Sequence, residues 1–125
     1  MPKIMAIDDS ASFLMELESI ISKGGHQLLS TTDTTRALRL VAEHQDIDLF
    51  LLDYNMPKAN GITMCQEIRK LSPYEKTPII MLTSFSSEKM MASGREAGVT
   101  AWVIKPNRGL QILTVIDKIL KAGKA

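Results

Sequence analysis

Polar side chains that could bind a cation and a phosphoryl group follow four of the five short apolar runs in this sequence. Asp8 and Asp9 follow the first run and Asp53 follows the third, while Thr83 and Lys105 follow the fourth and fifth. If these runs are parallel strands, the polar residues meet at one edge of the sheet, where ligands bind. Three carboxylates there would repel one another, and uncompensated burial would raise their pKa values. The group therefore indicates a bound cation.

Oxygen ligands alone select a hard cation. Mg²⁺ fits because it retains water molecules and needs only one or two protein carboxylates, and no His or Cys follows these runs to favour zinc. Lys105 adds a positive charge and Thr83 adds a hydroxyl, and Pro106 turns the chain directly after the lysine. A metal, an ammonium and a hydroxyl around Asp53 would stabilise a phosphoryl group.

Each of these signals is weak by itself. A lone lysine after a strand is usually a solvated surface charge, and an isolated Asp8-Asp9 pair would be read as a turn with a helix cap. The combination of four polar groups after four separate runs favours the chemical interpretation.

The elements that must position these residues alternate along the whole chain. Strands are predicted where short runs are mostly apolar at consecutive positions, at residues 4–7, 27–30, 49–52, 79–82 and 101–104. Between and after the runs, apolar residues recur at helical spacing, as in Phe13, Leu14, Leu17, Ile20 and Ile21. Five strands alternating with five helices predict a doubly wound α/β domain with a parallel sheet.

Capping residues mark the ends of the predicted helices. Ser10 and Asp33 are expected N-caps, and Gly24-Gly25 should end the first helix. Ser72-Pro73 should end the third helix and Gly98 the fourth. Residues 87–97 form the weakest of the predicted helices because their apolar content is mostly methionine and alanine around a glycine.

These residues resemble the response-regulator receiver family of two-component signalling. The resemblance covers essentially the whole chain and rests on Asp8-Asp9, the segment 53–57 (DYNMP) with Gly61 downstream, Thr83-Ser84 and Lys105-Pro106, in that order. It implies a flavodoxin-like receiver fold whose five parallel strands lie in the order 2-1-3-4-5. A chain of 125 residues is then one receiver domain, residues 1–125.

The resemblance also implies a role for each site residue. Asp53 accepts a phosphoryl group from a histidine kinase, Lys105 contacts that group, and Thr83 moves to bind it. The implied Mg²⁺ ligands are Asp8, directly or through water, Asp9, Asp53 and the backbone carbonyl of Asn55.

Other implied roles concern switching and dephosphorylation. Trp102 occupies the position of the family's switch aromatic, which is usually Tyr or Phe. Asn55 and Phe85 lie where the family varies the access of water to the phosphoryl group. Asn107 departs from the Phe that most often follows the Lys-Pro pair, so the packing of that loop is an open point.

The favoured function is a stand-alone response regulator. Phosphorylation of Asp53 would reshape the face formed by the fourth helix, the fifth strand and the fifth helix, and that face would bind a target protein. The chain is most similar to single-domain chemotaxis regulators, which implies a chemotaxis kinase and the flagellar switch as partners. A phosphate shuttle in a phosphorelay would give the same pattern. The domain would not be an enzyme, beyond assisting its own phosphorylation and dephosphorylation.

Three alternatives have specific counter-evidence. A haloacid-dehalogenase-like phosphatase or phosphotransferase usually has a second Asp two residues after its nucleophile, and Asn55 stands there. A phosphorylation-silent interaction domain is disfavoured because Asp9, Asp53, Thr83 and Lys105 are all present. A nucleotide or flavin binder needs a glycine-rich phosphate loop, and the first run is followed by acidic residues instead.

Composition excludes several partner classes. The 15 basic residues nearly balance the 14 acidic ones, so electrostatic capture of nucleic acid or of a membrane surface is not expected. No run has the length of a membrane span or of a signal-peptide core, which predicts a cytoplasmic protein, expected as a monomer. Cys65 is the only cysteine and is expected in the core; His26 and His44 have no second ligand or nucleophile beside them.

Overall fold

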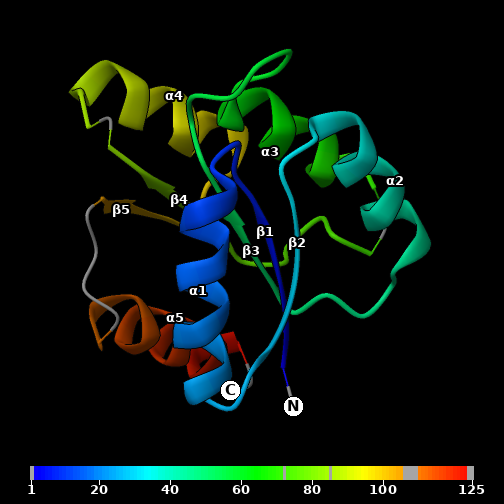
Figure 1. Cartoon of the computed structure of the whole chain (residues 1–125). Coiled ribbons are helices and arrows are strands. Elements are labelled where there is room, and N and C mark those ends of the chain that lie inside the picture. The colour runs from blue at the N-terminus through cyan, green and yellow to red at the C-terminus, as the bar shows by residue number, and fades with distance from the viewer. Residues whose placement is uncertain (1, 72, 85, 106–109, 124–125) are drawn as a thin grey trace.

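The computed structural model describes residues 2–71, 73–84, 86–105 and 110–123. Helices and strands alternate through these residues (Figure 1). The strands are β1 (Lys3–Ile7), β2 (Gln27–Thr31), β3 (Leu49–Leu52), β4 (Ile79–Thr83) and β5 (Ala101–Ile104). The helices are α1 (Ala11–Lys23), α2 (Thr34–Glu43), α3 (Gly61–Arg69), α4 (Glu88–Ala97) and α5 (Leu110–Gly123).

The five strands form one parallel sheet in the order β2-β1-β3-β4-β5, which confirms the predicted fold and strand order. Strand β3 pairs with β1 in the register Ile7 opposite Leu52. The backbone N–H of Asp53 continues this ladder and donates to the carbonyl of Ile7 at 3.0 Å. Asp8 and Asp53 therefore leave adjacent strands side by side.

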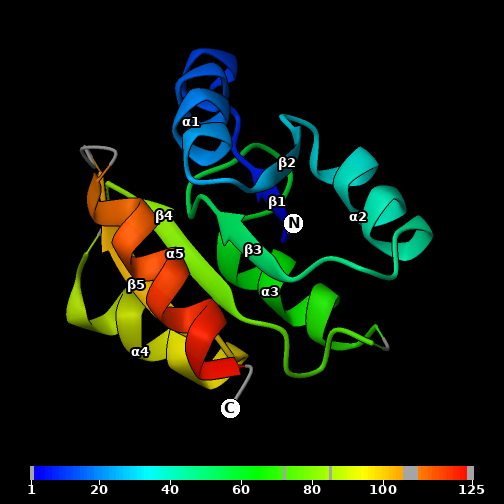
Figure 2. The same cartoon turned by 90° about the horizontal axis from the view of Figure 1, so that it is seen from below.

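Helices cover both faces of the sheet, as Figure 2 shows from below. Side chains alternate along the central strands: Phe50 and Leu52 of β3 join the core beneath α2 and α3, whereas Leu49 and Leu51 join the core beneath α1 and α5. This alternation follows from the two-residue period of a strand. Because both faces are buried, the strands are apolar at nearly every position.

The predicted caps are largely confirmed. Ser10 and Asp33 cap α1 and α2 by accepting backbone N–H groups, and Gly24 follows the end of α1. Gly98 ends α4 with a left-handed φ of 101°, a conformation that glycine adopts without steric cost.

Helix α3 ends earlier than the sequence predicted. It stops at Arg69, and the expected stop at Ser72-Pro73 lies three residues further on, with Ser72 outside the described residues. The guanidinium of Arg69 donates to the carbonyls of Tyr74, Thr77 and Gly98. These bonds tie the end of α3 to the loop before β4 and to the C-cap of α4. Pro73 accounts for the end of the helix, because proline has no N–H to donate to the carbonyl four residues earlier, that of Arg69.

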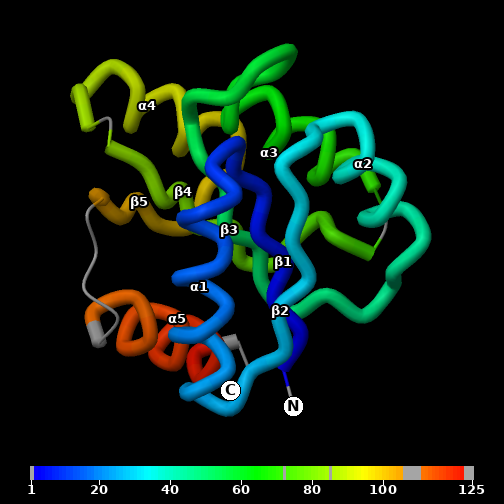
Figure 3. Tube along the Cα trace, viewed as in Figure 1, coloured from blue at the N-terminus to red at the C-terminus, as the bar shows by residue number. Residues whose placement is uncertain are grey.

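The start of β1 and the end of α5 lie toward the same end of the sheet (Figure 3). The carboxyl ends of the strands, where the polar residues follow, lie at the opposite end. Among the described residues, none of the helices combines the length and apolarity that spanning a membrane requires. Cys65 is buried, as predicted.

Candidate functional site

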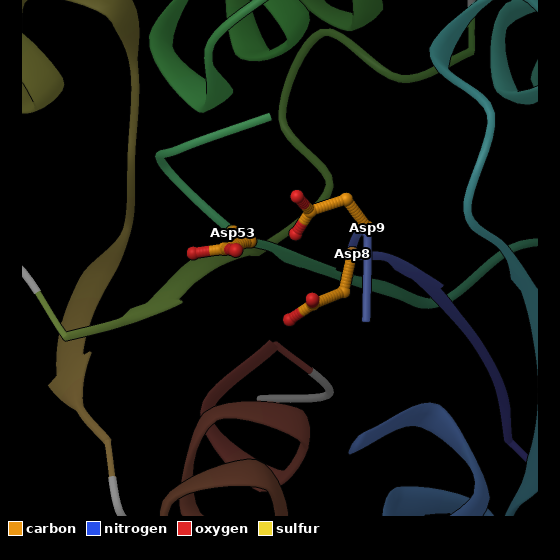
Figure 4. A group of neighbouring side chains, drawn as sticks. All are labelled: Asp8, Asp9 and Asp53. Atoms are coloured by element: carbon orange, nitrogen blue, oxygen red, sulfur yellow. The ribbon is translucent and has the colours of Figure 1, made fainter. Parts of the chain in front are cut away.

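Three carboxylates gather at the carboxyl ends of β1 and β3, as the sequence predicted. Asp8, Asp9 and Asp53 each place one carboxylate oxygen within 4.8 Å of the others (Figure 4). Asp8 and Asp53 are buried, whereas Asp9 is exposed. The cluster thus has a protein side and a side open to solvent.

Lys105 supplies the positive charge of this site. Its Nζ lies 2.5 Å from Oδ2 of Asp8 and 3.7 Å from Oδ2 of Asp53, and its side chain is only 16% exposed. The backbone N–H of Lys105 donates to the carbonyl of Thr83, which fixes the residue at the end of β5. The carboxylate closest to its ammonium is Asp8 rather than Asp53.

The pKa of the Asp53 carboxyl is raised above its ordinary value. Burial is the main cause, and the neighbouring Asp8 charge adds to it. The ammonium of Lys105, a hydrogen bond from Thr83 and the backbone N–H of Asn55 act in the opposite direction without cancelling the rise. The site therefore holds more negative charge than its own donors compensate.

This donor set fits Mg²⁺. The three carboxylates provide hard oxygen ligands, and within the described residues they are the one cluster of this kind with room for a metal. A divalent cation beside Asp53 would stabilise its ionised form against burial and against the repulsion from Asp8, the two causes of its raised pKa. The exposed side of Asp9 leaves space for the water molecules that Mg²⁺ retains.

The loop between β3 and α3 is held against the site by a glycine. The backbone N–H of Gly61 donates to the carbonyl of Tyr54 at 2.8 Å. A Cβ at this position would collide with the carbonyl oxygen of Asp53 and would lie 2.6 Å from the sulfur of Met81. Only glycine lets the start of α3 approach the phosphoacceptor candidate this closely.

The same loop contains a strained residue. Lys58 has a φ of 72°, which is the left-handed region that residues other than glycine rarely adopt. The backbone N–H of Ala59 donates to the carbonyl of Pro57 at 2.8 Å, so Lys58 is the centre of a γ-turn. The sequence contained no signal for this turn because lysine is not a typical residue for a positive φ.

Thr83 and Trp102 lie on the β4 and β5 side of the site. Thr83 is fully buried at the end of β4, and its side chain hydrogen-bonds the Asp53 carboxylate. The half-buried ring of Trp102 lies 6.4 Å from the ring of Tyr54, centroid to centroid. A Cβ on Gly94 of α4 would lie 2.9 Å from Cζ3 of Trp102, so the missing side chain makes room for the indole.

Some predicted roles stay predictions. The structure places the backbone N–H of Asn55 on Asp53, and the metal-ligand role of the Asn55 carbonyl remains an expectation. Phe85 and the segment with Pro106 and Asn107 lie outside the described residues.

One neighbour of the site was not predicted from the sequence. Phe13 was assigned only to the apolar stripe of the first helix, yet Nζ of Lys105 lies over its ring, 4.0 Å from the centroid. The position of Phe13, one turn after the helix cap, could have indicated a place beside the site, because the first turn of α1 lies at the same edge of the sheet as Asp8.

The comparison with known families decides the identity. The family model of the response regulator receiver domain matches residues 4–117. This chain belongs to the response regulator receiver family. A chemotaxis protein CheY homolog of Campylobacter jejuni is 25% identical over 122 residues, which cover 97% of this chain and 94% of that protein.

Two further comparisons, one with a longer protein and one with a solved structure, agree with this assignment. A probable transcriptional regulator ycf27 of Guillardia theta is 39% identical over 95% of this chain, but the match covers only 45% of that longer protein. The solved structure of Vibrio cholerae CheY4 superposes with a TM-score of 0.90 at 29% identity, covering 94% of this receiver domain and 98% of the other chain. The fold of this receiver domain is therefore CheY-like.

Proposed function

We propose that this receiver domain accepts a phosphoryl group on Asp53 from a histidine kinase in a Mg²⁺-dependent reaction. One observation carries the proposal: the buried Asp53 carboxylate lies beside two further carboxylates, has the ammonium of Lys105 at 3.7 Å and accepts a hydrogen bond from Thr83. A carboxylate in that position can attack phosphorus. The product carries charge on three phosphoryl oxygens, and the same neighbouring groups can stabilise that charge.

Each residue of the site would have a separate role in phosphoryl transfer. An ionised Oδ of Asp53 attacks the phosphorus, the bond from phosphorus to the donor breaks, and the electron pair leaves with the donor group. Lys105 and the hydroxyl of Thr83 contact the transferred phosphoryl oxygens. Asp8, Asp9, Asp53 and the carbonyl of Asn55 would hold Mg²⁺, which supplies positive charge to those oxygens. The pKa of Asp53 is raised without a metal, and a cation at this site would lower it and keep the carboxylate ionised for attack.

The phosphorylated domain then acts as a stand-alone response regulator. It binds a target protein through α4, β5 and α5, and it performs no catalysis beyond its own phosphorylation and dephosphorylation. The relative named a chemotaxis protein CheY homolog, matched over nearly its full length, supports a role in chemotaxis. The flagellar switch is then the proposed target. In this proposal the protein works as a monomer in the cytoplasm and binds neither nucleic acid nor membrane directly.

The acceptor is tested by labelling with acetyl phosphate in Mg²⁺, followed by intact-protein mass spectrometry. The parent should take up a single phosphoryl group and Asp53→Asn should take up none, because an amide is not nucleophilic at phosphorus. Asp46→Asn serves as the matched control, since Asp46 is an exposed carboxylate that pairs with Lys3 away from the cluster. Labelling of Asp53→Asn to the parental extent would reject Asp53.

The metal role of Asp9 is tested in the same assay. Asp9→Ala should weaken Mg²⁺ binding and slow labelling together, since it removes one of the three carboxylates. An unchanged Mg²⁺ titration would reject Asp9 as a ligand. Turnover of a small phosphomonoester by the parent would favour the phosphatase alternative.

A further inference from the structure

The ammonium of Lys105 has a third neighbour besides the two carboxylates. Its Nζ lies over the ring of Phe13 at 4.0 Å from the centroid, well within the range of a cation–π interaction. The same atom lies 2.5 Å from Asp8 and 3.7 Å from Asp53. Because the side chain of Lys105 is largely buried, this attraction acts on a partly desolvated charge.

Two hydrogen bonds fix Phe13 relative to the acidic cluster. The backbone N–H of Ser10 donates to Oδ1 of Asp8 at 3.0 Å. The backbone N–H of Phe13 donates to Oγ of Ser10 at 3.2 Å. The first turn of α1 is therefore tied to Asp8, and the ring is held beside the site by the helix cap rather than by its own packing alone.

We propose that Phe13 is a positioning residue for phosphoryl transfer, acting through Lys105. The inference rests on the proposed phosphorylation of Asp53. When Asp8 engages a metal, Lys105 loses its nearest carboxylate, and a hydrated ammonium on a flexible stem would then move toward water. The ring of Phe13 keeps attracting the ammonium and holds it within reach of the phosphoryl group on Asp53. The expected contribution is about three- to tenfold in the rate of phosphorylation.

A purely structural role for Phe13 predicts different results. The residue is half-buried and packs against the core between α1 and α5, so its removal could act through packing alone. Three variants separate the two roles. Phe13→Tyr keeps an electron-rich ring, Phe13→Leu keeps an apolar side chain without a ring, and pentafluorophenylalanine at position 13 keeps the shape but its ring face no longer attracts a cation.

The contact itself is measured by NMR in Mg²⁺ with beryllium trifluoride as the phosphoryl mimic. An aromatic ring above the ammonium shifts the side-chain methylene protons of Lys105 upfield by its ring current. The parent and Phe13→Tyr should show this shift in the loaded state, and Phe13→Leu should lose it. Identical Lys105 methylene shifts in the loaded parent and in Phe13→Leu would overturn the inference.

The consequence is measured as the rate of labelling by acetyl phosphate at saturating Mg²⁺. Phe13→Leu and the pentafluoro variant should be about three- to tenfold slower than the parent, and Phe13→Tyr should stay within about twofold. A parental rate in the pentafluoro variant would show that packing alone matters and would overturn the positioning role. A parent that takes no phosphoryl group would instead defeat the proposed function, while the NMR comparison would still report whether the ring holds Lys105.

Discussion

The centre of the sheet and its β5 edge differ sharply in how well they are packed. Every residue of β3 and β4 is buried, whereas three residues of β5 are half-buried and Ile104 is 43% exposed. In α4, which flanks this edge, Gly94 is the one buried residue. Asp8 and Asp53 follow the well-packed strands β1 and β3, while Lys105 follows the edge strand.

This difference in packing suits the proposed division between a fixed acceptor site and a surface that responds to it. Buried strands open rarely, and segments with few buried apolar contacts open at low free energy. Thr83 joins the two regions, because it ends the buried strand β4, bonds Asp53 and pairs in register with Ile104. We therefore expect a change at Asp53 to reach β5 through a displacement of Thr83.

Truncating one side chain in each region tests the contrast most strongly. Leu49→Ala should lower the free energy of unfolding by about 3 kcal/mol, because Leu49 is fully buried in β3. Ile104→Ala should cost less than about 1 kcal/mol, since much of this side chain is already in water. Urea unfolding of both variants gives the two values, and equal losses would remove the distinction between centre and edge.

The charge state of Asp53 gives the second prediction. The pKa of Asp53 is raised in the folded domain, so the protonated carboxyl favours folding and the ionised carboxylate disfavours it. The stability that protonation contributes is fully present at a pH below the unfolded pKa, near 3.8, and is lost as the pH rises through the folded pKa. Without Mg²⁺, Asp53→Asn should be more stable than the parent at neutral pH, and the advantage should shrink on acidification.

Thermal unfolding across pH measures this difference. Added Mg²⁺ should stabilise the parent more than Asp53→Asn, because the metal binds the folded carboxylate cluster. A parental stability that exceeds that of Asp53→Asn at neutral pH without metal would contradict the burial of an uncompensated charge.

The smallest effect on stability is expected from Gly94→Ala at the edge. The added methyl would lie 2.9 Å from Trp102 and must move the indole, while alanine itself favours the helix by about 1 kcal/mol. The two effects offset, so the unfolding free energy should change by less than about 1 kcal/mol. Emission of Trp102 should nevertheless shift to the red and its access to quencher should rise. Unchanged emission would show that the position of the indole does not depend on the missing side chain at Gly94.

Much of the fold and the core of the site could be predicted from the sequence. The apolar runs located the strands, and Asp8, Asp9 and Asp53 gather as expected because the carboxyl ends of parallel strands share one edge. The strand order came from the family resemblance, since alternation alone permits several orders.

Other features depend on long-range geometry that periodicity does not contain. The ring of Phe13 over Lys105 joins residues from α1 and from the end of β5, and the stripe of α1 accounted for the phenylalanine without it. The γ-turn at Lys58 has a positive φ that the residue type does not indicate. The guanidinium of Arg69 donates to carbonyls that only the folded chain brings near it.

The most direct test of coupling between the fixed site and the edge uses Trp102, the only tryptophan in the chain. Beryllium trifluoride with Mg²⁺ should change the emission and quencher access of Trp102 in the parent, because we expect Thr83 to leave its bond to Asp53 and open space toward β5. Thr83→Ala should largely lose this response while still binding the mimic. A full parental response in Thr83→Ala would contradict transmission through Thr83, even if Asp53 is the phosphorylated residue.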